Sequence, residues 1–176
     1  MKILIAYSST EGQTRKIARY CADYLFGQGH SVELTEAEDA QDTEISRFDA
    51  VLLAGSVHAG RYQKPLIKLA REKAAALGKT RAAFMSVSLA AAGDDPDDWK
   101  GLKDCVARFA EKTGWTPPTV FHVAGAFRFS EYDFFKSWAM RWIAAQKDQA
   151  VDPHQDKEYT DWAGLKASLD GWLSAV

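Results

Sequence analysis

The sequence predicts an α/β fold in which a five-stranded parallel sheet carries helices on both faces. Short apolar segments alternate along the chain with longer segments whose apolar residues recur every three or four positions. The second apolar segment alternates in polarity, as an edge strand does, whereas the third is apolar throughout, as a central strand is. Strands that alternate with helices pair in parallel through right-handed crossovers, and an edge position for the second strand fits the order 2-1-3-4-5.

The first two strands and the helix between them follow from the opening of the chain. Four apolar residues precede Tyr7, and we predict a strand over Lys2–Tyr7. A helix is predicted over Thr14–Phe26, because apolar residues recur at helical spacing until the chain reaches Gly27. The segment of alternating polarity is Ser31–Thr35. The apolar face of the predicted helix consists of Ile17, Ala18, Cys21, Ala22 and Leu25.

The middle of the chain supplies two buried strands and the helix that connects them. Ala50–Ala54 is uniformly apolar and predicts a central strand. Pro65 can occupy the first position of the next helix, which Gly78 ends. A fourth strand is predicted over Ala82–Val87. One face of the intervening helix carries Leu66, Ile67, Ala70, Ala74 and Leu77.

Two further helices and a fifth strand complete the predicted fold. The acidic run at residues 94–98 is typical of a solvated helix start, and this helix ends near Gly114. A fifth strand is predicted over Val120–Ala126, and the last helix begins near Asp161. The apolar faces of the two helices consist of Trp99, Leu102, Val106 and Phe109, and of Trp162, Leu165, Leu169 and Trp172, respectively.

An insert of more than thirty residues, Phe127–Thr160, separates the fifth strand from the last helix. Connections in α/β units usually have about 2–6 residues. At helical spacing the insert presents an aromatic face with basic residues beside it, so we expect a helical insert. Such a helix can lie in a membrane interface, line a pocket for a large flat anion, cover core or form a dimer contact. The face consists of Phe135, Trp138, Ala139, Trp142 and Ile143, with Lys136, Arg141 and Lys147 nearby.

Composition limits the classes of function that the chain can have. Its 176 residues suit a single domain over residues 1–176, and 47% hydrophobic residues are normal for a soluble globular protein. A net charge of −2 argues against nucleic-acid binding. No apolar run reaches the roughly 20 residues of a membrane span, and no N-terminal secretion signal is seen. Cys21 and Cys105 read as buried free thiols, no cluster has metal-ligand spacing, and no hydrolase motif appears.

Three loops at the carboxyl ends of strands one, three and four are rich in glycine, serine or small residues: Ser8–Thr14, Ser56–Tyr62 and Ser86–Gly93. In the predicted strand order these ends meet where the winding reverses, which is where ligands bind. The first loop offers four hydroxyl groups and a helix N-terminus without a Lys or Arg before Arg15, and it lacks the nucleotide-triphosphate and dinucleotide motifs. It therefore predicts a phosphate site. The alternative is an ordinary strand-to-helix turn that Ser or Thr caps.

Several motifs carry a resemblance that covers almost the whole chain. The chain resembles the flavodoxin-like, menaquinone-dependent protoporphyrinogen IX dehydrogenases of bacterial haem synthesis. The insert, together with the closing Tyr-Thr-Asp-Trp motif, is its most specific part, because simple flavodoxins lack that combination. One departure is the second loop, where the family often has Ser-Ile-Arg-Tyr-Gly and this chain has Ser-Val-His-Ala-Gly-Arg. The matching pieces are Ser8, Gly12-Gln13-Thr14, Gly55-Ser56, Gly60, Tyr62, Phe84, Ser86-Val87, Ala124-Gly125-Ala126 and Tyr159-Thr160-Asp161-Trp162.

The resemblance implies a flavodoxin-like fold, FMN as cofactor and the oxidation of protoporphyrinogen IX to protoporphyrin IX with menaquinone or another quinone as acceptor. The reaction removes six electrons, so three two-electron cycles are needed, and no side chain is assigned as a catalytic base. The first loop would take the phosphate, and the other two would flank the isoalloxazine ring. The implied FMN-binding residues are Ser8, Ser9, Thr10, Glu11, Gly12, Gln13, Thr14, Ser56, Val57, His58, Ala59, Gly60, Ser86, Val87, Ser88 and Leu89.

Two other functions stay open at this point. An electron-carrier flavodoxin would share the fold, but such carriers tend to be strongly acidic around the flavin, whereas this chain is near charge balance. A soluble NAD(P)H:quinone reductase would also share it. For the dehydrogenase we expect a cytoplasmic protein with peripheral contact to the inner membrane. His58 reads equally as a solvated loop histidine, and His122, inside a strand, as a core residue with its hydrogen bonds satisfied.

Overall fold

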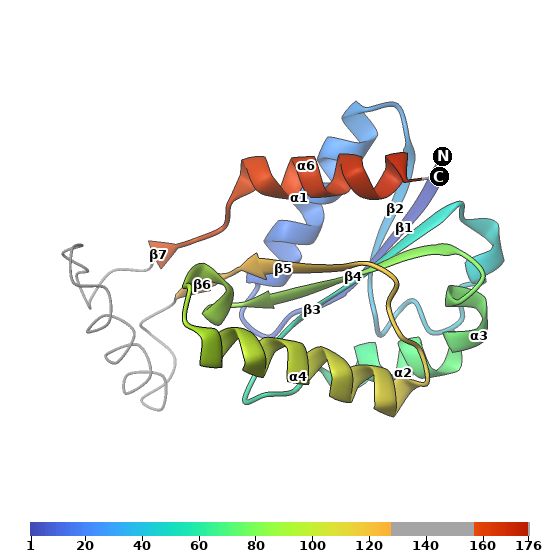
Figure 1. Ribbon diagram of the computed structural model, residues 1–176. Helices are drawn as coiled ribbons and strands as arrows, with labels where there is room; N and C mark the ends of the chain where they lie inside the picture. Colours follow the sequence, from blue (N-terminus) through green and yellow to red (C-terminus); the bar gives the residue numbers. More distant parts are fainter. Residues whose placement is uncertain (128–156, 176) are drawn as a thin grey trace.

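A parallel sheet in the order β2-β1-β3-β4-β5 forms the centre of the molecule (Figure 1). The structure is a computed structural model that describes residues 1–127 and 157–175. All four strand pairs are parallel, so the predicted fold class and strand order are confirmed. The strands are β1 (Lys2–Ser8), β2 (Ser31–Glu36), β3 (Ala50–Ser56), β4 (Arg81–Ser88) and β5 (Val120–Ala124).

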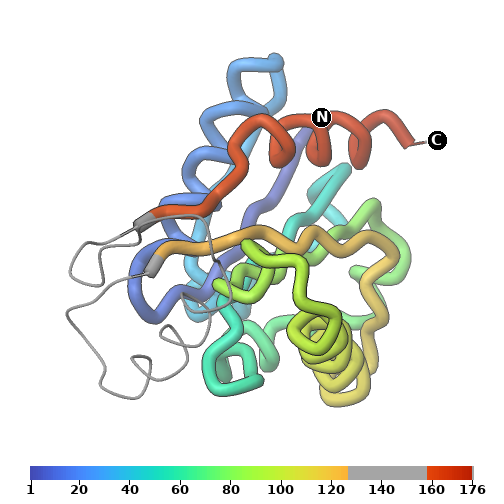
Figure 2. The backbone as a smooth tube through the Cα atoms, turned by 60° about the vertical axis from the view of Figure 1, so that its left-hand side comes forward, coloured from blue at the N-terminus to red at the C-terminus, as the bar shows by residue number. Residues whose placement is uncertain are grey.

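Helices cover both faces of this sheet. On one face lie α1 (Gln13–Gly27) and α6 (Trp162–Ser174), and Figure 2 shows them side by side. On the other lie α2 (Lys64–Glu72), α3 (Ala74–Leu77) and α4 (Pro96–Thr113) (Figure 1). Short 3₁₀ turns, η1 (Ile45–Arg47) and η2 (Ala90–Ala92), lie in two of the connections.

The two sides of the sheet each bury an apolar cluster, because successive side chains of a strand point to opposite faces. In β1, Leu4 faces the layer of α2 and α4, whereas Ile3 and Ile5 face the layer of α1 and α6. All three are fully buried. The residues of β2 are all exposed or half-buried, and none is fully buried, as expected for an edge strand.

Helix ends follow the capping signals of the sequence. Asp95 caps α4 by accepting hydrogen bonds from the N–H groups of Asp97 (2.8 Å) and Asp98 (3.3 Å), which confirms the predicted acidic helix start. The left-handed conformation of Gly114 ends the same helix. Asp161 caps α6 through the N–H of Gly164 (3.0 Å).

Two predicted elements are interrupted in the structure. The helix expected from Pro65 to Leu77 breaks at Lys73, so that α2 and α3 are separate while both keep apolar residues on the sheet. A periodic apolar pattern does not distinguish one helix from two that are offset by a single residue. The strand expected to reach Ala126 ends at Ala124: the N–H of Gly125 still bonds the carbonyl of Ser88 in β4 (3.0 Å), but its carbonyl accepts from the N–H of Tyr159 (3.0 Å).

The chain enters and leaves the insert at one place. After Gly125, β6 (Ala126–Phe127) pairs antiparallel with β7 (Lys157–Glu158). The predicted aromatic helix lies between them, outside the residues that the structure describes. The predicted insert, 127–160, therefore overlaps the described residues only at its two ends, which lie beside the carboxyl end of β5, where the N–H of Tyr159 bonds the carbonyl of Gly125 (3.0 Å).

Candidate functional site

The three predicted loops meet at the carboxyl edge of the sheet. The strand register places Ser8 beside Gly55 and Gly55 beside Ser86, so β1, β3 and β4 end at the same level. The N–H of Val57 donates to the carbonyl of Val87 (2.8 Å), which joins the second loop to the third. The structure thus brings together the residues that the sequence singled out.

The first loop has the features of a phosphate site. Gly12 adopts a left-handed conformation (φ +85°) just before α1, and its N–H donates to the hydroxyl of Ser9 (2.9 Å). The N–H groups of the first helical turn, beginning with Gln13, have no carbonyl within the helix to bind. Thr14 is buried, and no described residue hydrogen-bonds to its hydroxyl. Free N–H groups and an orphaned hydroxyl at a helix N-terminus suit an anion with several oxygens.

Gln63, which is not among the residues predicted from the sequence, connects the first and second loops. Its side-chain amide donates to the hydroxyls of Thr10 (3.0 Å) and Ser56 (2.6 Å). Thr10 is exposed, and its hydroxyl is already an acceptor in this contact. No periodicity or motif marks a glutamine at the start of a helix as a bridge, so only the folded arrangement reveals it.

The second loop is a tight hairpin turn. The N–H of His58 donates to the carbonyl of Arg61 (2.8 Å), and the N–H of Arg61 donates to the carbonyl of His58 (3.0 Å). Ala59 (φ +47°) and Gly60 (φ +73°) between them are both left-handed, as in a type I′ turn. The described residues contain no other non-glycine residue with positive φ. Ala59 is exposed at the tip of the turn.

In the third loop, the two serines have different surroundings. Ser86 is fully buried, and its hydroxyl bonds the phenol of Tyr62 (2.8 Å) inside the α2 and α4 layer. Burial raises the pKa of Tyr62, so the phenol stays protonated. Ser88 accepts from the N–H of Ala91 (3.2 Å). Any contact of Ser86 with a ligand at the edge would therefore use its backbone rather than its hydroxyl.

The closing Tyr-Thr-Asp-Trp segment lies against the first loop. Thr160 donates from its hydroxyl to the carbonyl of Ala124 (2.8 Å) and accepts from the side-chain amide of Gln13 (3.2 Å). Lys16 pairs with Glu158 and, chiefly through that hydrogen bond, lowers the pKa of this carboxyl group. These contacts thus hold the segment 158–160 against the end of β5 and the start of α1.

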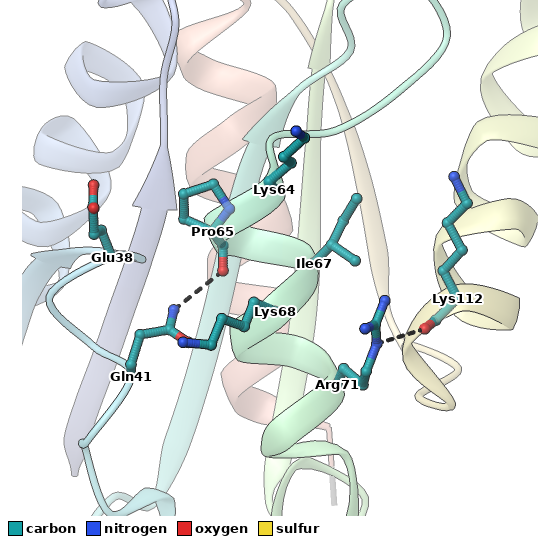
Figure 3. Close-up of a pocket in the computed structure, with 8 residues that line it drawn as sticks. All are labelled: Glu38, Gln41, Lys64, Pro65, Ile67, Lys68, Arg71 and Lys112. Carbon is teal, nitrogen blue, oxygen red and sulfur yellow. Dashed lines mark hydrogen bonds between the residues drawn. The ribbon is translucent and has the colours of Figure 1, made fainter.

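A basic groove runs along the outer side of α2 (Figure 3). Its volume is about 670 Å³. The side chain of Gln41 bonds the carbonyl of Pro65 (3.2 Å), and that of Arg71 bonds the carbonyl of Lys112 (3.1 Å). None of the predicted FMN-binding residues lines it. The lining residues are Glu38, Gln41, Lys64, Pro65, Ile67, Lys68, Arg71 and Lys112.

Other expectations concern thiols, metals and His122. Cys21 and Cys105 are free and buried, as predicted, and burial raises the pKa of Cys21 to about 12. Within residues 1–127 and 157–175 there is no group of side chains that could hold a metal ion. In the same ranges, no helix combines the length and apolar character needed to cross a bilayer. The expectation for His122 was wrong: the residue is half-buried, and no described residue hydrogen-bonds to its Nδ1.

The donor set at the edge fits FMN. The orphaned hydroxyl of Thr14 and the open backbone at Gly12, where an added Cβ would meet nothing within 4 Å, leave a cradle at the helix start. Hydroxyls and N–H groups can hold a phosphomonoester without a paired cation. The two remaining loops lie beside this cradle and offer backbone groups and small residues to a flat ring.

Comparisons with known proteins agree with this arrangement. The family model described as "Flavodoxin domain" (Flavodoxin_5) matches residues 4–153. Protoporphyrinogen IX dehydrogenase [quinone] of Escherichia coli (strain K12) is 28% identical over 163 residues, which cover 92% of this chain and 89% of that protein. The protein of the same name from Leishmania major is 25% identical over 166 residues, covering 94% of this chain and 71% of that protein.

A solved structure shares the fold. Oxidised Flavodoxin 2 from Bacillus cereus superimposes with a TM-score of 0.51 at 18% sequence identity, covering 82% of this chain and 97% of that one. At this level of identity the likeness concerns the fold alone.

Proposed function

This chain belongs to the Flavodoxin_5 family of flavodoxin domains, and we propose that it binds FMN and oxidises protoporphyrinogen IX to protoporphyrin IX with a quinone, such as menaquinone, as acceptor. The observation that carries the cofactor assignment is the orphaned hydroxyl of Thr14 beside the left-handed Gly12. The names of the relatives, which match over about nine-tenths of this chain, support the substrate and the acceptor.

The residues of the three loops would divide the binding of FMN between them. Thr14 and the N–H groups at the start of α1 would hold the phosphate, and the type I′ turn at Ala59-Gly60 would lie against the ring. FMN, when bound, supplies the two-electron redox chemistry, and three cycles would convert one porphyrinogen. The protein's part is binding, orientation and exclusion of water. No side chain is assigned as a base.

The insert would bring the apolar reactants to this edge. The two described ends of the insert, β6 and β7, pair with each other, and Thr160 bonds both Ala124 and Gln13, so these ends lie next to the phosphate loop. Residues 128–156 connect the two ends along the sequence. Their sequence is aromatic and basic, which suits a porphyrinogen with carboxylate groups, a quinone or an anionic bilayer surface. We therefore propose peripheral membrane contact through this segment, and a cytoplasmic location.

The proposed reaction is tested by an anaerobic assay of porphyrin formation, which fluorescence reports. The FMN-loaded protein is incubated with protoporphyrinogen IX and a menaquinone analogue, and parallel samples omit the quinone or the protein. We expect turnover only in the complete mixture, with three quinones reduced for each porphyrin formed. A matched sample supplies NADPH in place of the porphyrinogen. Quinone reduction by NADPH without porphyrinogen oxidation would contradict the proposal and favour an NAD(P)H:quinone reductase.

A further inference from the structure

The turn of the second loop holds a conformation that its sequence does not favour. A type I′ turn needs positive φ at both central positions, and Asn-Gly or Gly-Gly pairs adopt it most readily. Here the first position is Ala59 (φ +47°), whose Cβ makes the left-handed conformation unfavourable. Strained residues of this kind persist where surrounding contacts fix them, and they cluster at binding sites.

Contacts that can fix the turn come from α4. The guanidinium of Arg108 donates to the carbonyl of Gly60 (3.3 Å), and the same nitrogen lies 3.2 Å from the thiol sulfur of Cys105. The thiol also approaches the carbonyl of Gly60 (3.5 Å). Cys105 is buried and Arg108 follows it by one helical turn, so the turn is fastened to a helix that packs on the sheet.

The contacts with α4 leave the peptide between Ala59 and Gly60 free to bind a ligand. The carbonyl of Gly60 is directed at α4, whereas the peptide between Ala59 and Gly60 makes no hydrogen bond to any described residue. Arg108 lies on α4, and its hydrogen bonds to described residues go to Gly60 and Cys105, not to the phosphate loop. Its influence on a ligand would therefore pass through the shape of the turn.

We propose that Arg108, with Cys105, is a positioning clamp that holds the strained Ala59-Gly60 turn in the conformation that receives the flavin ring. The inference rests on the proposed FMN site and adds to it a residue outside the three loops. The clamp predicts that ring binding, not phosphate binding, depends on α4. It also predicts that a turn which favours the type I′ conformation by itself no longer needs Arg108.

The first test compares flavins that differ only in the phosphate. Arg108→Gln removes the charged donor, and Lys100→Gln, an exposed site on the same helix, is the charge-matched control. Dissociation constants for FMN and riboflavin are measured by quenching of flavin fluorescence. Arg108→Gln should raise both constants by the same factor, about three- to tenfold, and the control should leave both unchanged. Wild-type affinity in Arg108→Gln, or a loss confined to FMN, would overturn the clamp.

The second test restores the turn without the clamp. Ala59→Asn creates the Asn-Gly pair that type I′ turns prefer. In this background Arg108→Gln should change the flavin dissociation constants less than twofold, because the turn is then stable on its own. An undiminished effect of Arg108→Gln in the Ala59→Asn protein would show that Arg108 acts by another route and would overturn the proposal.

A third measurement needs no flavin and separates this inference from the function itself. Hydrogen exchange of the Arg61 N–H, which bonds the carbonyl of His58 across the turn, reports the turn in the apoprotein. Exchange should be faster in Arg108→Gln than in wild type and return toward wild type with Ala59→Asn. Absence of flavin binding in wild type would contradict the proposed function, whereas an unchanged exchange rate would contradict the clamp alone.

Discussion

The hydroxyl of Thr14 is buried without a described partner at the start of α1, where the proposed FMN phosphate would bind. An unsatisfied buried hydroxyl is unfavourable by about 1–3 kcal/mol. A phosphate at the start of α1 would satisfy it. Removal of this hydroxyl should therefore weaken FMN binding without destabilising the protein that lacks FMN.

We predict that Thr14→Val weakens FMN binding while leaving the apoprotein as stable as wild type or more stable. Valine keeps the shape and removes the hydroxyl, so the lost hydrogen bond should reduce affinity by about 0.5–1.5 kcal/mol, more if the bond is charge-assisted. Titration with FMN and thermal unfolding of the apoprotein measure the two effects. Riboflavin, which lacks the phosphate, is the control ligand. Unchanged FMN affinity would place the phosphate elsewhere.

A second residue-scale prediction concerns acid stability. Burial lowers the pKa of His122, with a further contribution from Lys103. The unfolded chain, whose histidine pKa is about 6.5, then binds more protons than the folded protein, so stability should rise with pH through that region and fall on acidification below it. His122→Gln should lose less stability than wild type between pH 7.5 and pH 5 in urea unfolding. Parallel pH profiles for the two proteins would contradict this.

Residue types in the sequence predicted which loops meet at the sheet edge better than they predicted the direction of each side chain. The small and hydroxyl residues of the first loop were placed at the sheet edge, because strand order alone determines which ends meet. The direction of the Ser86 hydroxyl, toward Tyr62, depends on strand pleat and on the helix packed above it. Gln63 and Arg108 act across tens of residues of sequence, which no local pattern records.

At the scale of elements, the close approach of α2 to β3 depends on a glycine. A Cβ at Gly55 would lie 2.4 Å from Cδ2 of Leu66, which is fully buried. We predict that Gly55→Ala destabilises the protein by about 1–3 kcal/mol through overpacking, measured by urea unfolding. The pair Gly55→Ala with Leu66→Val should recover part of that loss. If Gly55→Ala is as stable as wild type, α2 does not pack on β3 this closely.

The antiparallel pair of β6 and β7 allows the insert to be removed without strain. Phe127 and Lys157 are opposite each other, so an Asn-Gly linker in place of residues 128–156 can close a two-residue hairpin. We predict that this variant keeps the FMN affinity and far-UV spectrum of wild type but loses porphyrinogen turnover and co-sedimentation with anionic liposomes together. Full turnover would contradict a role in substrate access, and loss of FMN would place the segment in the flavin site.

Elements were predicted well where a repeat of apolar residues is long, and less well at their ends. The patterns for α1, α4 and α6 gave helices within a few residues of the observed bounds. The end of β5 coincides with a tertiary contact, the hydrogen bond from the N–H of Tyr159 to the carbonyl of Gly125 (3.0 Å), and a periodic apolar pattern does not record the break at Lys73. The pairing of β6 with β7 joins segments about thirty residues apart and could not be read from either.

At the scale of the whole molecule, two apolar layers and a parallel sheet hold three loops in register at one edge. The layers are independent clusters, one under α1 and α6 and the other under α2 and α4. The first loop leads into α1 on one face of the sheet, whereas the proposed clamp residue Arg108 lies on α4 on the other face. A flavin at the edge would therefore be held from both faces of the sheet, with the return from the insert beside its phosphate end.

The most direct test of the central claim is an anaerobic half-reaction followed by flavin absorbance in a stopped-flow instrument. FMN-loaded protein is mixed with protoporphyrinogen IX in the absence of quinone, and a menaquinone analogue is added afterwards. We expect the oxidised-flavin band to bleach on the first mixing, as the porphyrinogen gives up its first two electrons, and to return on the second, with porphyrin appearing only when the quinone allows three cycles. A flavin that stays oxidised with porphyrinogen but is bleached by a chemical reductant would contradict a porphyrinogen dehydrogenase and leave an electron carrier on the same fold.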